Sequence, residues 1–219
     1  MPAPVLWQYN FSNFNEKARW ALDFKGISHV RRSLLPGGPR AMALSLRGTL
    51  PVLDLGGERI VDSTRIIAAL EQRFPQPALF PDEPHERALA LQLEDFFDEE
   101  AGHELRRAAF YEWRTSPGFV SDLLTTGRSR ATRGLMRAIL PGALVYARRR
   151  YRIYATDAER ARAKLATALD RITAELKPSG YLVGDSFTVA DLAAAALLFR
   201  WLCRQRSSIA TRSYRTGER

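Results

Sequence analysis

The stretch SNFNEKARWALDFKGI, Ser12 to Ile27, decides how the first half of the chain folds. Its apolar residues have the i, i+4, i+7, i+8 spacing of one buried helix face, at Phe14, Ala18, Ala21 and Leu22. Gly26 is placed to end this helix. A short hydrophobic run upstream, Val5-Leu6-Trp7, predicts a buried strand. The stretch therefore predicts a strand that leads directly into a helix.

Ser12 lies at or just before the predicted helix N-terminus, close to the end of the preceding strand. Free backbone N–H groups and the positive end of the helix dipole converge at such a position, which suits a bound anion or a thiolate. Serine is also a common N-cap for purely structural reasons. The stretch alone leaves both interpretations of Ser12 open.

Length and composition indicate a globular protein of two domains. The chain has 219 residues, of which 46% are hydrophobic and 26% are charged. A single cysteine, Cys203, excludes an intrachain disulfide framework and fits a reducing compartment, so we expect a cytoplasmic location. The sequence shows no secretion signal and no run of 18 apolar residues that would predict a membrane span.

The formal net charge of +9 and the pI of about 10.2 come largely from arginine, which outnumbers lysine 29 to 4. Eight arginines lie between Asp122 and Asp157 with no acidic residue among them: Arg128, Arg130, Arg133, Arg137, Arg148, Arg149, Arg150 and Arg152. A second cluster occupies the C-terminal end of the sequence. Such patches suit nucleic acid or an anionic membrane surface, but most charged runs are solvated faces.

Residues 1–76 alternate between strand and helix signals. Strands are predicted at residues 4–9 and 29–35, the second at a sheet edge, with a short helix at 40–46. A hairpin with a Gly56-Gly57 turn follows, and Ser63 is predicted to cap the next helix. The order β-α-β-α-β-β-α predicts a small mixed sheet with helices on its faces.

The stretch Pro75–Pro84 contains four prolines and is predicted to be a linker. Beyond it the apolar periodicity is helical. Three buried faces are predicted, the second in a helix bent at Pro141: Leu89, Leu93, Phe96 and Phe97; Leu135, Ile139, Leu140 and Leu144; Leu165, Leu169, Ile172 and Leu176. The acidic residues between Glu94 and Glu100 are expected on a solvated helix face or at a dimer contact.

A capping box marks the start of a further helix. Thr188 is the predicted N-cap, with Asp191 three residues later, and Phe187 and Leu192 can close a hydrophobic staple. The apolar run that follows predicts a buried central helix at residues 190–198.

Four motifs in register resemble the glutathione transferase family over about residues 4–200. They are S-x-F-x-x-K-x-R-W-A-L-x-x-K-G-I from Ser12, T-L-P-V-L from Thr49, Asp62-Ser63-Thr64, and G-D-S-F-T-V-A-D-L from Gly184. The resemblance implies an α/β thioredoxin-like N-terminal domain followed by an all-α C-terminal domain.

The expected boundaries are a glutathione-binding domain at 1–76, a linker at 77–85 and an all-helical domain at 86–203. The polar, basic remainder at 204–219 is predicted to be disordered. The segment 118–152 has no assigned counterpart in the family. With its arginines beside apolar residues, it could lie on a membrane surface.

The resemblance implies site residues as well. Ser12 matches the catalytic serine or cysteine position, although Asn13 replaces the family's proline. Serine at this position implies transferase or isomerase chemistry instead of disulfide chemistry. Pro51 matches the family's cis-proline, and Val52 matches the residue whose backbone pairs with glutathione. The pair Asp62-Ser63 matches the residues that hold the γ-glutamyl end of glutathione.

The implied function is transfer of alkyl or aryl groups to glutathione, as in detoxification. Ser12 and nearby N–H groups would stabilise the glutathione thiolate, which attacks a small apolar electrophile. Tyr9 is an alternative activator or a packed aromatic residue, and Tyr111 and Trp113 either line the electrophile pocket or serve in packing. The resemblance also implies a homodimer. No metal site is predicted, because the three histidines have no ligand spacing with each other or with Cys203.

A second hypothesis from another class remains. In it the chain is a non-catalytic relative with the same fold, which uses its basic helical domain to contact a protein, nucleic acid or a membrane surface. Salt-sensitive association with anionic lipid or nucleic acid, without glutathione binding, would favour this hypothesis.

Overall fold

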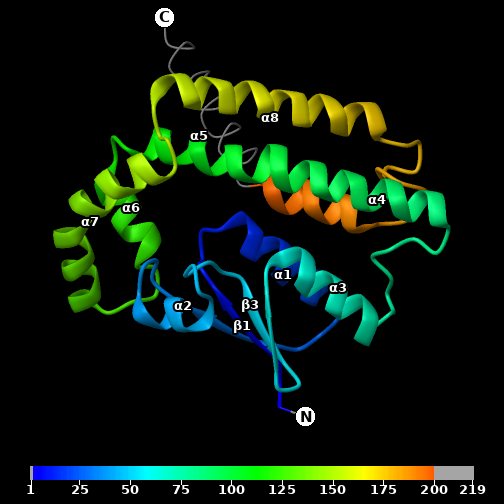
Figure 1. The fold of residues 1–219 in the computed structure, drawn as a ribbon, viewed down its shortest axis with the longest axis horizontal. Helices are drawn as coiled ribbons and strands as arrows, with labels where there is room; N and C mark the ends of the chain where they lie inside the picture. The colour runs from blue at the N-terminus through cyan, green and yellow to red at the C-terminus, as the bar shows by residue number, and fades with distance from the viewer. Residues whose placement is uncertain (1, 200–219) are drawn as a thin grey trace, which may run out of the picture.

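The computed structural model describes residues 2–199, and these form a sheet-containing half beneath a layer of long helices (Figure 1). The predicted order β-α-β-α-β-β-α in the first half is confirmed. The elements of this half are β1 (Val5–Gln8), α1 (Asn13–Phe24), β2 (Val30–Ser33), α2 (Pro39–Leu44), β3 (Val52–Leu55), β4 (Glu58–Val61) and α3 (Ser63–Arg73).

The four strands form one mixed sheet in the order β2-β1-β3-β4. Strand β1 pairs in parallel with β2 and antiparallel with β3. Strands β3 and β4 form the predicted hairpin, in which Gly56 and Gly57 have φ values of 61° and 90°. Both values lie in the left-handed region that a two-residue hairpin turn of this kind requires. Strand β2 is at the edge of the sheet and is mostly exposed, as predicted.

Helix α1 packs beside α3 on the sheet (Figure 1). The predicted apolar face of α1 is confirmed, since Ala18, Ala21 and Leu22 are fully buried. Gly26 ends the helix with a φ of 64°, and the N–H of Ile27 donates to the carbonyl of Leu22. This is the C-terminal geometry that favours glycine.

The second half is helical, as the periodicity predicts. Its elements are α4 (Pro84–Phe96), the π-helix η1 (Phe97–Gly102), α5 (His103–Trp113), α6 (Pro117–Leu124), α7 (Arg130–Arg150), α8 (Ala155–Glu175) and a helix at residues 189–199. Helix α3 ends at Arg73 and α4 begins at Pro84, so the proline-rich stretch contains no helix or strand. The domain boundaries at 76, 85 and 203 remain predictions. The tail at 204–219 and Cys203 lie outside the described residues.

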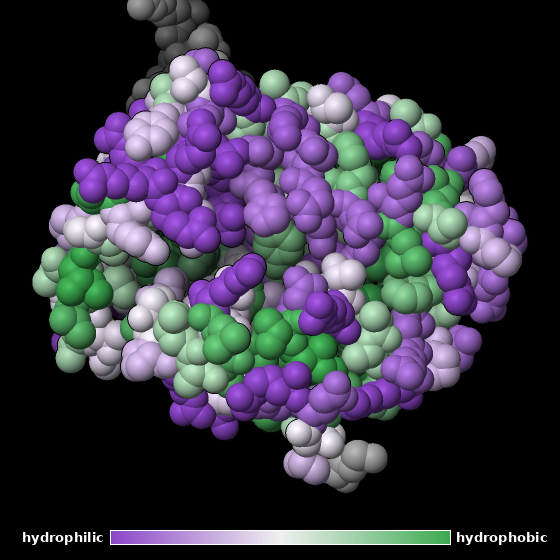
Figure 2. Space-filling model, viewed as in Figure 1, coloured by the Kyte–Doolittle hydropathy of each residue, from purple (hydrophilic) through white to green (hydrophobic). Residues whose placement is uncertain are grey.

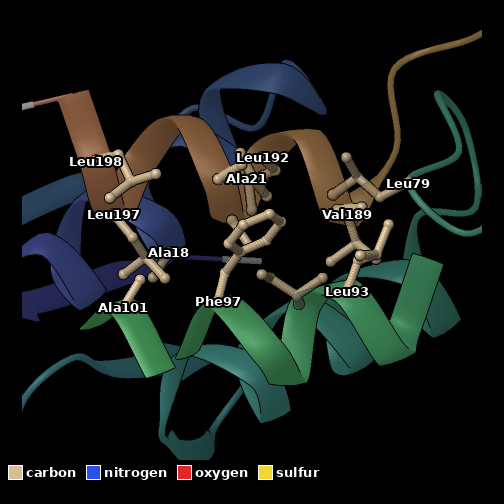
Figure 3. Packing of buried hydrophobic residues seen from close by; sticks show 14 of the residues in the cluster. Ala18, Ala21, Leu79, Leu93, Phe97, Ala101, Val189, Leu192, Leu197 and Leu198 are labelled. Carbon is tan, nitrogen blue, oxygen red and sulfur yellow. The ribbon is translucent and has the colours of Figure 1, made fainter. Parts of the chain in front are cut away.

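The helix at 189–199 lies at the centre of the core. Figure 3 shows its Val189, Leu192 and Leu197 facing side chains of α1 on one side and of the α4–η1 rod on the other. The predicted capping box is confirmed: the N–H of Thr188 donates to Asp191 Oδ2 at 2.8 Å. The other carboxylate oxygen of Asp191 accepts from the N–H of Leu182 at 2.8 Å. Both halves of the chain therefore share one core.

Two of the predicted helix faces are partly wrong. In α8 the buried stripe is formed mostly by small residues, which allow α5 to approach closely, and Leu176 at its end is exposed. In α7 the structure buries Leu140 but leaves Leu135 64% and Ile139 51% exposed. Because α7 packs mainly against the short helix α6, much of its apolar surface has no cover among the described residues.

The acidic cluster near the end of α4 is also not simply a solvated face. Glu94 is 2% exposed, and both it and Asp98 point inward to the ammonium group of Lys17. Lys17 of α1 thus pairs with two of the five acidic residues, and these two lie at the boundary between the halves.

Candidate active site

Ser12 is the N-cap residue of α1, in the short connection that leaves β1. Its backbone N–H donates to the carbonyl of Tyr9 at 3.1 Å, and its carbonyl accepts from the N–H of Glu16 at 3.1 Å. Its side chain makes no capping hydrogen bond with the helix. The backbone of Ser12 is therefore fixed while its hydroxyl is not used as a cap.

The first turn of α1 is polar but buried, and the side-chain amides of Asn13 and Asn15 anchor it to neighbouring segments. Asn13 Nδ2 donates to the carbonyl of Gly102 at 3.2 Å, which ties the helix start to the helical half. Asn15 Nδ2 donates to the carbonyl of Leu50 at 3.2 Å, which ties it to the loop before β3. Both side chains therefore have a structural role, and Asn13 has it at the position where the resemblance implies a proline.

Lys17 is fully buried and strengthens the same attachment. Its Nζ lies 2.5 Å from Glu94 Oε1 and 2.7 Å from Asp98 Oδ2. It also donates to Thr64 Oγ1 at 3.3 Å, at the start of α3. Burial raises the pKa of Asp98, and the nearby Lys17 opposes that rise. The network joins α1, α3, α4 and η1, and sequence spacing gave no signal for it because the partners of Lys17 are 47 to 81 residues away from it.

The peptide bond between Leu50 and Pro51 is cis, as the family resemblance implied. Val52 follows it as the first residue of β3 and is fully buried. Strand β3 is internal to the sheet, between β1 and β4. Val52 lies opposite Trp7 of β1 on one side and Val61 of β4 on the other.

Asp62, and not Ser63 as predicted, caps α3. One Asp62 carboxylate oxygen accepts from the N–H groups of Thr64 and Arg65, at 3.0 and 3.3 Å. Asp62 has a φ of 88°, a left-handed value that costs a non-glycine residue about 1–3 kcal/mol. Ser63 is the first helical residue and is buried. The pair thus presents an exposed carboxylate beside a serine at a helix N-terminus.

The side chain of Tyr9 contacts residues of the sheet-containing half. Its hydroxyl donates to the carbonyl of Gly48 at 2.6 Å, and its ring stacks on Phe11 with centroids 5.8 Å apart. Burial, with a smaller contribution from Tyr151, raises the pKa of Tyr9 to about 12. Because the Tyr9 hydroxyl already donates its proton to Gly48, whereas the Ser12 hydroxyl makes no capping hydrogen bond, the hydrogen bonds favour Ser12 over Tyr9 as a donor to a thiolate.

Tyr111 and Trp113 lie at the C-terminal end of α5, whose N-terminal end meets α1. Arg114 lies over the Tyr111 ring at 3.6 Å, and Trp113 packs edge-on against Phe119 at 5.7 Å. Ten residues of helix, about 15 Å, separate Trp113 from the helix start. The N–H of Asp62 donates to the carbonyl of Pro51 at 3.3 Å, and Asn15, in the first turn after Ser12, contacts the neighbouring Leu50. Tyr111 and Trp113 lie at the other end of α5 from the contact with Asn13.

Two stretches of the chain match known family domains. Residues 6–78 match the glutathione S-transferase N-terminal domain, and residues 155–206 match the glutathione S-transferase C-terminal domain. The chain belongs to the glutathione S-transferase family. The family resemblance inferred from the four motifs is thereby confirmed.

Curated relatives of this transferase-family chain carry two kinds of name. A maleylacetoacetate isomerase of Pseudomonas aeruginosa is 35% identical over 91 residues, which cover 38% of this chain and 43% of that protein. A probable glutathione S-transferase of Solanum tuberosum is 29% identical over 83 residues, which cover 36% of this chain and 38% of that protein. The matched regions thus span less than half the length of these relatives.

Solved structures of family members show the same fold. A glutathione S-transferase from Methylobacterium radiotolerans, in complex with glutathione sulfonate, has a TM-score of 0.63 and 23% identity, and the match covers 90% of this chain and 77% of that one. A beta-etherase from Sphingobium has a TM-score of 0.68 and 19% identity, with coverages of 90% and 83%. The thioredoxin-like half and the helical half are therefore confirmed as the fold.

Two further findings concern residues 2–199. No group of three or more His, Cys, Asp or Glu side chains in this range could hold a metal ion. In the same range, no helix combines the length and apolar character needed to cross a bilayer.

Proposed function

We propose that the protein is a glutathione-dependent transferase in which Ser12 stabilises the glutathione thiolate. The observation that carries this proposal is the Ser12 hydroxyl, which lies at the N-terminus of α1 without capping it. A free hydroxyl and the positive end of a helix dipole both favour a thiolate over a thiol. The hydrogen bond from Asn15 to the carbonyl of Leu50, which ties the start of α1 to the loop before β3, is the second supporting feature.

The remaining roles follow from chemical complementarity. The backbone of Val52 would pair with the cysteinyl residue of glutathione, beside the Pro51 loop. The exposed Asp62 carboxylate suits the γ-glutamyl ammonium group, because the opposite charges attract. Ser63 and its N–H would receive the γ-glutamyl carboxylate at the start of α3. The Ser63 hydroxyl matters in this assignment, since Asp62 already accepts hydrogen bonds from two N–H groups in the first turn of α3.

The reaction then has a simple balance. The thiol loses its proton to solvent, because the site lowers its pKa from about 8.5 towards neutrality. The thiolate sulfur bonds to an electrophilic carbon, and the leaving group departs with its bonding electrons. Ser12 donates a hydrogen bond to the sulfur and never becomes the nucleophile.

Calorimetric titration of the full chain with glutathione tests the proposal. We expect binding by the wild type and weaker binding by Ser63→Ala. In Ser12→Ala the pKa of the bound thiol, followed by thiolate absorbance, should rise by about 1 to 2, as expected for the loss of a hydrogen bond to a charged group. The matched control is Ser116→Ala, because Ser116 is also an N-cap without a side-chain capping bond, at the start of α6.

If folded wild-type protein does not bind millimolar glutathione, the proposal is wrong. Equal pKa values of the bound thiol in Ser12→Ala and Ser116→Ala would remove the role of Ser12. The homodimer, the cytoplasmic location and a part in detoxification remain predictions from the family resemblance and composition.

A further inference from the structure

A basic cavity of about 150 Å³ lies where the start of α5 meets the end of α7. Figure 2 shows strongly hydrophilic side chains over this corner of the helical half. The cavity is lined by His103, Arg106, Arg107, Arg150, Tyr151 and Arg152. The lining is therefore polar and mostly cationic.

Two of the four arginines are neutralised by acidic neighbours. Arg107 pairs with Glu104, and its Nε donates to the carbonyl of Tyr151 at 3.3 Å. Arg152 pairs with Asp157 at 3.4 Å. The cavity wall therefore contains two ion pairs that hold its shape.

Arg106 and Arg150 are not neutralised. Within residues 2–199 neither has a carboxylate at ion-pair distance. Instead both guanidinium groups lie over the ring of Tyr151, 4.6 and 5.5 Å from its centroid. Burial lowers the pKa of Arg106, which means that its charge is poorly solvated in this position. A bound anion would compensate for that lost solvation.

The cavity opens beside the proposed thiol site. The ring of His103 is 5.5 Å from the ring of Phe14, two residues beyond Ser12 on α1. The carbonyl of Gly102, next to His103, accepts the hydrogen bond from Asn13. A ligand group in the cavity would therefore lie close to Ser12.

We propose that this cavity binds a carboxylate of the electrophilic substrate, with Arg106 and Arg150 as the residues that select it. The proposal rests on the transferase function proposed above and names its substrate class. The planar guanidinium fork matches a carboxylate in geometry as well as in charge. Whole ligands occupy about 300–1,000 Å³, so a cavity of this size holds only the acidic end and leaves the reactive carbon towards Ser12.

A matched pair of probes separates charge from shape. The first probe is 3,5-dinitrobenzoate and the second is its methyl ester. Neither carries a halide leaving group, and the binding of each is measured in the absence of glutathione. We expect the wild type to bind the carboxylate more tightly than the ester. Arg106→Gln and Arg150→Gln should each weaken carboxylate binding about tenfold or more, as for loss of a charge-assisted bidentate contact, and leave ester binding unchanged.

The control is Arg148→Gln, because Arg148 is on the same end of α7 but contacts Tyr154 and does not line the cavity. This control should behave as the wild type. Arg150 is exposed, so Arg150→Gln provides a variant that keeps the fold if Arg106→Gln does not. Equal binding of the two probes by the wild type, or equal effects of all three variants, would overturn the proposal.

Turnover completes the test. With glutathione and 4-chloro-3,5-dinitrobenzoate, the thiolate sulfur bonds to the ring carbon and chloride leaves with the bonding electrons. The Arg106→Gln variant should raise KM for this probe about tenfold and leave KM for its methyl ester unchanged. If the carboxylate binds as expected but glutathione does not, the cavity proposal stands as an anion site and the transferase proposal fails.

Discussion

The first turn of α1 and the helix α7 reverse the usual relation between polarity and burial. Asn13, Asn15 and Lys17 are polar and buried, whereas Leu135 and Ile139 on α7 are apolar and exposed. Each of the three polar residues has a hydrogen-bond partner on another element. The apolar face of α7 faces solvent, with only Met136 and Leu140 turned inward. Burial in this fold thus follows the partners that tertiary structure supplies.

This difference between the first turn of α1 and helix α7 bears on the proposed function. The buried polar turn fixes the backbone around Ser12, which the proposed thiolate chemistry requires. Helix α7 lies between the two stretches that match the family, and only its C-terminal end contributes to the basic cavity. The following predictions test how far this contrast holds.

The largest effect is expected for Lys17→Met. The change leaves Glu94 and Asp98 buried without a cation, which costs about 3–5 kcal/mol of unfolding free energy. Urea denaturation measures this loss. Lys164→Met is the control, because its ion pair with Glu100 is exposed and should contribute less than about 1 kcal/mol. Similar losses in both variants would show that the buried network does not hold the halves together.

A pair of neighbouring substitutions tests α7 itself. Leu140→Ala should lower the unfolding free energy by about 2–4 kcal/mol, because Leu140 is 3% exposed and its removal leaves a cavity. Ile139→Ala should change it by less than about 0.5 kcal/mol. If Ile139→Ala is as costly as Leu140→Ala, a partner covers this face in solution, and sedimentation would then show an assembly.

Asn15→Ala should lower the unfolding free energy by about 1–3 kcal/mol, since it leaves the buried carbonyl of Leu50 without its donor. It should also weaken glutathione binding, because that carbonyl precedes Pro51. Calorimetric titration of the folded variant with glutathione measures this loss of affinity. A variant that loses stability but keeps full affinity would confine Asn15 to a purely structural role.

The smallest effect concerns Tyr9. Its folded pKa of about 12 exceeds the ordinary value near 10, so the folded state holds the proton more tightly. The stability that this contributes is complete below pH 10 and is lost as the pH rises through about 12. Absorbance at alkaline pH should show one late-titrating tyrosine that is missing in Tyr9→Phe. An unchanged titration curve in that variant would contradict this assignment.

Much of the fold could be predicted because its signals are local. The strand before Ser12, the Gly56-Gly57 hairpin and the Thr188–Asp191 capping box each involve residues within a few positions of one another. The exposed side of α7 could not be predicted, because periodicity gives a helix its apolar stripe but does not say whether another element covers it.

The features of the site also divide into those that could be predicted from the sequence and those that could not. The family resemblance placed Ser12, Pro51 and Asp62 together, and the cis bond at Pro51 is confirmed. Asn15 and Lys17 contact residues that are 35 or more positions away in the sequence, and no local sequence pattern predicts these contacts. The basic cavity combines α5 with the end of α7, so an arginine cluster in the sequence could not be assigned to a site.

The position of the helix at 189–199 has a consequence for how the protein is made. This helix covers the outer face of α1, yet it is synthesised after every other described element (Figure 3). At ~5–20 residues per second, the interval between the completion of α3 and its appearance is on the order of ten seconds. During that time Ala18, Ala21 and their neighbours are exposed to other nascent chains. The packing of the sheet-containing half is therefore completed only after the helix at 189–199 has been synthesised.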